Sequence, residues 1–213
     1  MDPNLTTNAR DVDISALLPG AKIGRFEVIS VLGQGGFGIT YRARDTQLGR
    51  EVAIKEYLPT SLAYRDAGAT VLPRSTKVAE DFTWGCKRFV DEGRTLPTLH
   101  ETPGIVKVFD FLEINGTAYI VMEMLHGETL EGHIRKKGPL GSEVIERIVW
   151  PLLDGLEQVH AAGFLHRDIK PANILVCTEN LNSDVMMVES TENRLRADRS
   201  GELNRTGLRS VLA

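Results

Sequence analysis

One short stretch of the chain combines an acid, a lysine and an amide. It reads His166-Arg167-Asp168-Ile169-Lys170-Pro171-Ala172-Asn173. The carboxylate of Asp168 can accept or orient a hydroxyl proton, and the ammonium of Lys170 can offset negative charge on phosphate oxygens. The amide oxygen of Asn173 can ligate Mg²⁺. A turn with capping Asp and Asn would use the same residue types, but the spacing favours phosphoryl-transfer chemistry, which needs phosphate-binding elements upstream.

A glycine-rich stretch upstream could supply contacts to phosphate. The residues Gly33-Gln34-Gly35-Gly36-Phe37-Gly38 lie between the apolar runs 26–32 and 39–43, and a third such run covers 51–55. Dinucleotide-binding folds use the same glycine spacing before a helix, but β-branched and aromatic residues follow the glycines here, which indicates a strand. We therefore predict strand, glycine turn, strand, turn and strand, with backbone amides able to approach phosphate oxygens.

Lys55 ends the third of these strands, in the run Val52-Ala53-Ile54-Lys55. A lysine among apolar residues needs a partner for its charge, although a surface lysine with its stem on apolar neighbours would look similar. An apolar stripe with helical spacing predicts a helix over 82–96, which Pro97 stops. Glu92 lies at the edge of that stripe and is the predicted partner of Lys55, with Asp91 the weaker candidate.

The other predicted elements alternate in type along the chain. Residues 105–112 and 117–123 read as two strands joined by Asn115-Gly116, a strong hairpin signal, while 56–79 reads as a long connection. Helices are expected over 129–137 and 142–162, and a strand from 174. The predicted inner side of the second helix consists of Ile145, Ile148, Val149, Leu152, Leu156 and Val159.

Composition restricts the class of protein. The 213 residues are 42% hydrophobic and 25% charged, with a formal net charge of -4. Clustered basic residues are missing, so nucleic acid is not an expected partner. No apolar run approaches the ~20 residues of a membrane span, and Met1–Arg10 lacks the apolar core of a signal peptide. We expect a cytoplasmic protein.

The motifs, in their order, resemble those of the protein kinases: a glycine-rich hairpin, V-A-I-K and H-R-D-I-K-P-x-N. The resemblance covers about residues 24–176 and is greatest to bacterial serine/threonine kinases, because of Lys170 and the run Lys55-Glu56-Tyr57-Leu58-Pro59. It implies ATP and Mg²⁺ as cofactors and transfer of the γ-phosphoryl group to Ser or Thr hydroxyls of a protein. It also implies an α+β, bilobal fold, with a five-stranded antiparallel N-lobe that carries one main helix and an incomplete helical C-lobe.

The resemblance also implies a set of site residues. Those implied to be catalytic are Asp168, Lys170, Asn173, Lys55 and Glu92, with Asn173 as metal ligand. Those implied to bind the nucleotide are Leu32, Gly33, Gly35, Gly36, Phe37, Gly38, Thr40, Ala53, Lys55, Met122, Glu123, Leu125 and Leu175. Thr40 stands where the family pattern has Val, and it is also β-branched.

Downstream the pattern departs from the family. Neither D-F-G nor A-P-E occurs. The stretch most similar to D-F-G is 185–191, a strand-like run with Glu189 in place of the metal-binding Asp. We expect a chain truncated after the catalytic loop, with a flexible leader (1–22), an N-lobe (23–125), a partial C-lobe (126–176) and a disordered tail outside the family (177–213). The chain is then a kinase with impaired activity, or a non-catalytic fragment that binds nucleotide or a partner.

Overall fold

The computed structural model describes residues 15–95, 105–161, 169–177 and 185–187. The chain divides into two compact units, one up to His126 and one from Gly127 onward. No helix in the described part of the chain is long and apolar enough to cross a membrane.

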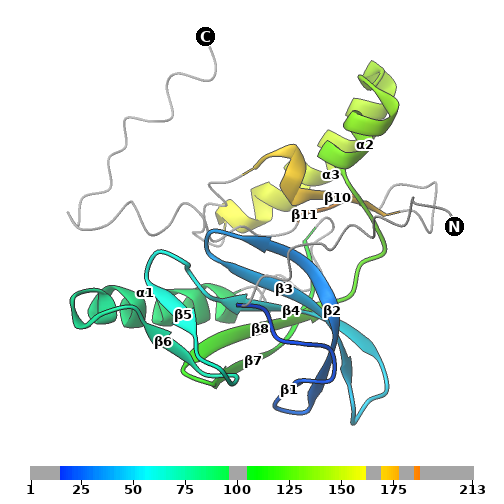
Figure 1. The fold of residues 1–213 in the computed structure, drawn as a ribbon. Coiled ribbons are helices and arrows are strands. Elements are labelled where there is room, and N and C mark those ends of the chain that lie inside the picture. The colour runs from blue at the N-terminus through cyan, green and yellow to red at the C-terminus, as the bar shows by residue number, and fades with distance from the viewer. Residues whose placement is uncertain (1–14, 96–104, 162–168, 178–184, 188–213) are drawn as a thin grey trace, which may run out of the picture. The chain divides into compact units, whose positions relative to one another are not determined.

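The first unit is built on a six-stranded antiparallel sheet in the order β1-β2-β3-β4-β8-β7 (Figure 1). The strands are β1 (Lys22–Ile23), β2 (Phe26–Gly35), β3 (Gly38–Asp45), β4 (Glu51–Tyr57), β7 (Val108–Ile114) and β8 (Thr117–Glu123). All five strands predicted for this unit are present, although β7 begins at Val108 rather than at residue 105. The predicted turn between β7 and β8 is confirmed, because Asn115 and Gly116 adopt φ values of 54° and 70°, as a two-residue hairpin turn requires.

The sixth strand comes from the segment predicted to be a flexible leader. Lys22 and Ile23 pair with Glu27 and Phe26, and Leu17 is buried. The backbone N–H of Leu17 donates to the hydroxyl of Tyr41 at 3.2 Å. Residues 15–22 therefore belong to the folded unit, since the apolar side chains of Leu17 and Ile23 are covered by the sheet; residues 1–14 lie outside the described part.

The predicted long connection over 56–79 contains regular structure. β4 continues to Tyr57, and β5 (Ala63–Arg65) pairs with β6 (Val71–Pro73) in a separate antiparallel hairpin. The hairpin is joined to the main sheet where the N–H of Val71 donates to the carbonyl of Asn115 at 2.8 Å. The polar turn residues 66–70 close it, with the Asp66 carboxylate accepting from the N–H groups of Gly68 and Thr70.

α1 (Thr76–Thr95) contacts β6, β7 and β8. It begins earlier than the predicted Phe82, directly after the β5–β6 hairpin. Phe82 and Phe89 are buried, and the ring of Tyr57 lies 5.5 Å from that of Phe82 and 5.6 Å from that of Phe89 between centroids. This aromatic cluster fixes α1 on the end of β4 that follows Lys55.

The second unit contains a small antiparallel sheet and two helices. β10 (Ile174–Cys177) pairs with β9 (Gly127–Thr129) on one side and β11 (Val185–Met187) on the other. α2 (Leu130–Lys137) is capped by the Thr129 hydroxyl, which accepts from the N–H of Gly132 at 3.0 Å. The 3₁₀ turn η2 (Pro171–Asn173) leads into β10.

α3 (Ser142–Ala161) corrects part of the predicted apolar face. Ile148, Leu152, Leu156 and Val159 are buried as predicted. Ile145 and Val149, however, are 45% and 38% exposed. The buried stripe is narrower than the sequence pattern indicates, because apolar residues occur on more of the helix than the described second unit covers.

Candidate functional site

Strand pairing brings four of the predicted nucleotide-binding residues of the first unit to one face of the sheet. Lys55 pairs with Thr40 on one side and Ile120 on the other, while Ala53 pairs with Met122. Residues paired across antiparallel strands point to the same face, as do residues two apart on one strand. Thr40, Ala53, Lys55 and Met122 therefore share a face, and Ala53 and Met122 provide an apolar part beside the Lys55 ammonium.

The glycine-rich hairpin is formed by β2 and β3, whose last pair is Gly35 with Gly38. A Cβ atom on Gly33, Gly35 or Gly36 would have nothing within 4 Å, so the backbone there is open to an approaching ligand. Gly38 differs, because a Cβ atom at this position would lie 1.9 Å from the Glu56 carbonyl oxygen. Gly38 is thus required for the close pairing of β3 with β4.

Lys55 is half-buried on β4, and Leu32 on β2 is 47% exposed. Glu92, the predicted partner of Lys55, lies within α1, but its side chain is outside the described part of the structure. The ion pair between the two stays a prediction.

Glu56, the neighbour of Lys55, points to the opposite face and is fully buried. Its carboxylate forms an ion pair with Arg65 of β5, and both side chains are at most 2% exposed. The Tyr41 hydroxyl donates to the same carboxylate at 2.8 Å. Burial and the charge of Glu56 raise the pKa of Tyr41, whereas Arg65 stays charged because the contact with Glu56 outweighs the opposing effect of burial on its pKa.

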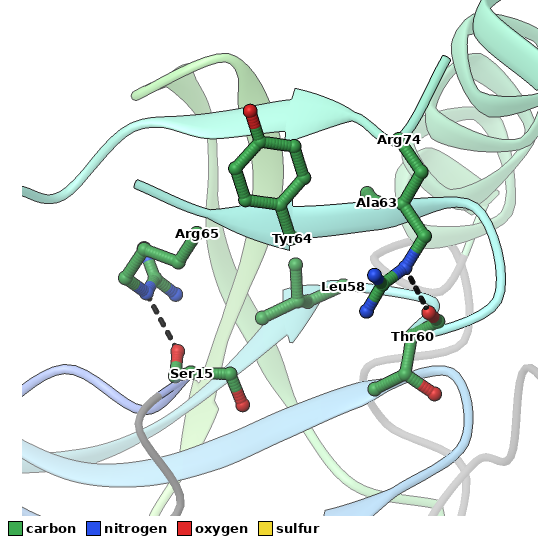
Figure 2. Close-up of a pocket in the computed structure, with 7 residues that line it drawn as sticks. All are labelled: Ser15, Leu58, Thr60, Ala63, Tyr64, Arg65 and Arg74. Atoms are coloured by element: carbon green, nitrogen blue, oxygen red, sulfur yellow. Dashed lines mark hydrogen bonds between the residues drawn. The ribbon is translucent and has the colours of Figure 1, made fainter. Parts of the chain in front are cut away.

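Arg65 connects this buried pair to two further segments. Its Nε donates to the Ser15 carbonyl at 2.7 Å, and its Nη1 donates to the Ala69 carbonyl at 2.6 Å. Figure 2 shows the contact with Ser15. The strand that carries Lys55 is therefore fixed from behind by the β5–β6 hairpin and the N-terminal segment. Sequence reasoning missed this network. Side chains alternate between the two faces of a strand, so Glu56 could have been placed on the face opposite Lys55, where a buried carboxylate needs a cation.

The end of β8 and the residues after it include Glu123 and Leu125, two of the residues implied to bind the nucleotide. The N–H of Glu123 donates to the Lys107 carbonyl at 2.9 Å, and the Glu123 side chain accepts from the N–H of Lys107 at 2.7 Å. These two bonds fix the end of β8 against Lys107. Leu125 is half-buried.

Three predicted residues lie close together in the second unit. Lys170 precedes η2, and its carbonyl accepts from the N–H of Asn173 at 2.8 Å, so one short turn joins them. Leu175 follows on β10, paired with Thr129. Asp168 lies outside the described residues, and its geometry is a prediction.

The described residues do not form a metal site on their own. They contain no group of three or more His, Cys, Asp or Glu side chains that could hold a metal ion. Asn173 is the one predicted ligand among them.

Two cavities in the described part of the first unit are lined by residues other than the predicted nucleotide-binding ones. One, of about 210 Å³, lies between the N-terminal segment and the β5–β6 hairpin (Figure 2). The other, of about 400 Å³, lies between α1 and the β7–β8 hairpin, and its lining includes Phe82, Cys86 and Val90.

The β-rich first unit with one long helix, the glycine hairpin and the lysine strand define a kinase-like fold. The sequence model of the protein kinase domain matches residues 26–187, so this chain belongs to the protein kinase domain family. The match includes β11, which lies in the stretch expected to be outside the family.

Relatives and solved structures agree with this assignment. The chain is 36% identical over 153 residues to the probable serine/threonine-protein kinase pknA2 of Bifidobacterium longum, covering 72% of this chain and 18% of that protein. It is 33% identical over 164 residues to PknE of Mycobacterium tuberculosis, covering 76% and 25%. The structure titled "PpkA-294 apo form" superposes with a TM-score of 0.76 at 35% identity, covering 82% of this chain and 61% of that chain. The chain thus spans only 18–25% of the curated relatives named here.

Proposed function

We propose that this chain is the nucleotide-binding part of a serine/threonine protein kinase that uses ATP to phosphorylate Ser or Thr hydroxyls of a protein. The strand register carries the proposal, because it sets Thr40, Ala53, Lys55 and Met122 on one face beside the glycine hairpin. The relatives named serine/threonine-protein kinases support it, as does a similar structure titled as a complex of Rad53 with AMP-PNP, with a TM-score of 0.59.

Each part of the proposed site has a distinct task. ATP supplies the phosphoryl group that is transferred. The open glycine backbone and the Lys55 ammonium would hold its phosphates, Ala53 and Met122 would contact the adenine ring, and the Glu123 carbonyl and Leu125 backbone would meet the ring edge. By resemblance to the family, Leu175 would also contact the nucleotide, and Lys170 would offset charge on the transferred group. Asp168 would orient the acceptor hydroxyl.

Mg²⁺ is part of the proposal through Asn173, which would supply one ligand. The sequence has Glu189 where the family has the second, bridging ligand. Phosphoryl transfer depends on positioning and on neutralising charge. We therefore propose that the 213-residue chain binds ATP but transfers its phosphoryl group slowly. The departure from D-F-G at 185–191 favours the second candidate function, a kinase unit that binds nucleotide or a partner without turnover.

Titration with a fluorescent ATP analogue tests nucleotide binding. Lys55→Met should weaken binding at least about tenfold, since one charge-assisted contact to phosphate is lost. Lys77→Met is the matched control, because Lys77 is an exposed lysine at the start of α1. Equal affinity of the native chain and Lys55→Met would contradict the assignment of Lys55.

A further inference from the structure

The glycine turn is held by a segment that sequence reasoning assigned to an irregular connection. The N–H of Leu58 donates to the carbonyl of Phe37 at 3.0 Å, and the N–H of Thr60 donates to the carbonyl of Gly36 at 3.1 Å. These bonds continue the β3–β4 pairing past Gly38 and Tyr57. Residues 58–60, here called the tether, therefore hold the backbone of the glycine turn along one side.

The tether orients the amides of the turn. In a trans peptide the carbonyl and the following N–H point in opposite directions. The Gly36 carbonyl points to Thr60, so the N–H of Phe37 points away from the tether. The Phe37 carbonyl points to Leu58, so the N–H of Gly38 also points away from the tether. The tether thus fixes the direction of two backbone donors in the turn proposed to hold phosphates.

Arg74 holds the tether itself. Its Nε donates to the Thr60 carbonyl at 2.6 Å, a contact that Figure 2 shows. The N–H of Arg74 donates to the Leu62 carbonyl at 2.8 Å, while the N–H groups of Leu62 and Ala63 both donate to the Pro59 carbonyl. Segment 58–62 is thus a tight turn with the glycine hairpin at one end and Arg74 at the other.

The place of Arg74 in the chain adds a second connection. It directly follows β6 and lies two residues before Thr76, the first residue of α1. One side of Thr60 therefore contacts the glycine turn, and the other side contacts the residue that joins the β5–β6 hairpin to α1. Arg74 therefore connects the start of α1 to the Thr60 carbonyl through its guanidinium and to the Leu62 carbonyl through its N–H.

We propose that Arg74 is a positioning residue for the glycine turn and that it controls the affinity for the phosphate groups of the nucleotide. The inference rests on the proposed function, because it assumes that the turn meets phosphates. It assigns to the β5–β6 hairpin the task of aligning the phosphate-binding backbone, in addition to its packing on the sheet.

Comparison of ATP with adenosine separates this role from general destabilisation. Arg74→Gln should weaken ATP binding about tenfold, the loss expected for misaligned charge-assisted hydrogen bonds, and should leave adenosine affinity within about twofold. Arg50→Gln is the matched control, because Arg50 contacts the Phe109 ring away from the glycine turn. Thr60→Ala should also bind both ligands normally, because Arg74 and Gly36 contact only the Thr60 backbone.

Equal ATP affinity in Arg74→Gln and the native chain would overturn the proposal, and so would an equal loss for ATP and adenosine. If the native chain binds neither ligand, the proposed function fails. The role of Arg74 in holding the tether is then tested by hydrogen exchange at the Leu58 and Thr60 amides. Faster exchange at both amides in Arg74→Gln, but not in Arg50→Gln, then supports the positioning role. Unchanged exchange overturns it.

Discussion

The contact between Glu56 and Arg65 is the most deeply buried charged pair among the described residues. A buried ion pair adds little net stability relative to apolar residues, but removing one partner leaves the other charge uncompensated. The pair also joins β4, β5 and residue 15 through the other donors of Arg65. Its main effect is to fix the back of the strand whose next side chain is Lys55.

Replacing Arg65 by Met should lower the free energy of unfolding by about 3–5 kcal/mol, because the buried Glu56 carboxyl is then left without its partner. The double variant Arg65→Met/Glu56→Gln should recover part of this loss. Arg42→Met is the control, since the Arg42–Glu51 pair is partly exposed and should contribute less than about 1 kcal/mol. Urea unfolding at pH 7 measures all of these variants. A loss below about 1 kcal/mol for Arg65→Met would contradict the burial of the Glu56–Arg65 pair.

At the scale of elements, the glycine hairpin combines an open side with a closely packed one. Gly38→Ala should lower the free energy of unfolding by about 1–3 kcal/mol or more, because its Cβ would overlap the Glu56 carbonyl and force β3 away from β4. Gly36→Ala should change it by less than about 0.5 kcal/mol, since nothing lies within 4 Å of that position. Thermal and urea unfolding distinguish the two, and equal stabilities would contradict the packing described here.

The sequence allowed prediction of the elements with strong periodic patterns. The five strands of the first unit and the Asn115-Gly116 turn follow from alternation and from turn chemistry. The β5–β6 hairpin could not be predicted in the same way, because each strand has only three residues and β6 ends in Pro73. Such short strands are stabilised by side chains distant in sequence, here Arg65 with Glu56, rather than by local propensity.

The candidate site was predictable only in part for a similar reason. Motif spacing predicts Lys55, Lys170 and Asn173 as site residues, because their expected roles depend on side chains. The contacts of Thr60 with Gly36 and Arg74 use backbone atoms of Thr60, which leave no signature in the sequence. The Lys55–Glu92 pair and the position of Asp168 remain predictions, since neither lies within the described side chains.

For the whole molecule, buried tyrosines predict sensitivity to alkaline pH. Burial, assisted by nearby acidic groups, raises the pKa of Tyr41, Tyr57 and Tyr119 above the ordinary value of about 10. Above that pH the unfolded chain loses phenol protons that the folded chain retains, so stability falls as pH rises, by up to about 1.4 kcal/mol per pH unit for each tyrosine.

We therefore expect cooperative unfolding above about pH 10, with phenolate absorbance at 295 nm appearing together with the loss of circular dichroism. Tyr41→Phe should shift this transition to higher pH if its stability at pH 7 is retained, because one ionisable phenol is removed. Gradual phenolate absorbance without loss of structure would contradict the burial of these tyrosines.

The phosphotransfer activity of the chain as a whole is expected to be weak. In an assay with radiolabelled ATP, Mg²⁺ or Mn²⁺ and a basic protein acceptor, the native chain should not exceed Asp168→Asn, because the family's bridging metal ligand is missing and loss of one such contact costs about 10²–10³ in rate. Turnover clearly above Asp168→Asn, and lost again in Glu189→Ala, would instead make Glu189 a working metal ligand.

The Glu56–Arg65 contact also limits how the chain can be recombined. Strand β4 carries a charge whose neutralising partner is on the β5–β6 hairpin, so the two pieces are interdependent modules. A chimera that receives β4 without the β5–β6 hairpin would bury Glu56 without a cation. A chimera that receives only the hairpin would carry Arg65 without its carboxylate partner. A deletion in segment 58–74 that removes Arg65 would therefore require Glu56 to be replaced by an apolar residue. The residue type at position 56 thus indicates whether the segment can be exchanged or shortened.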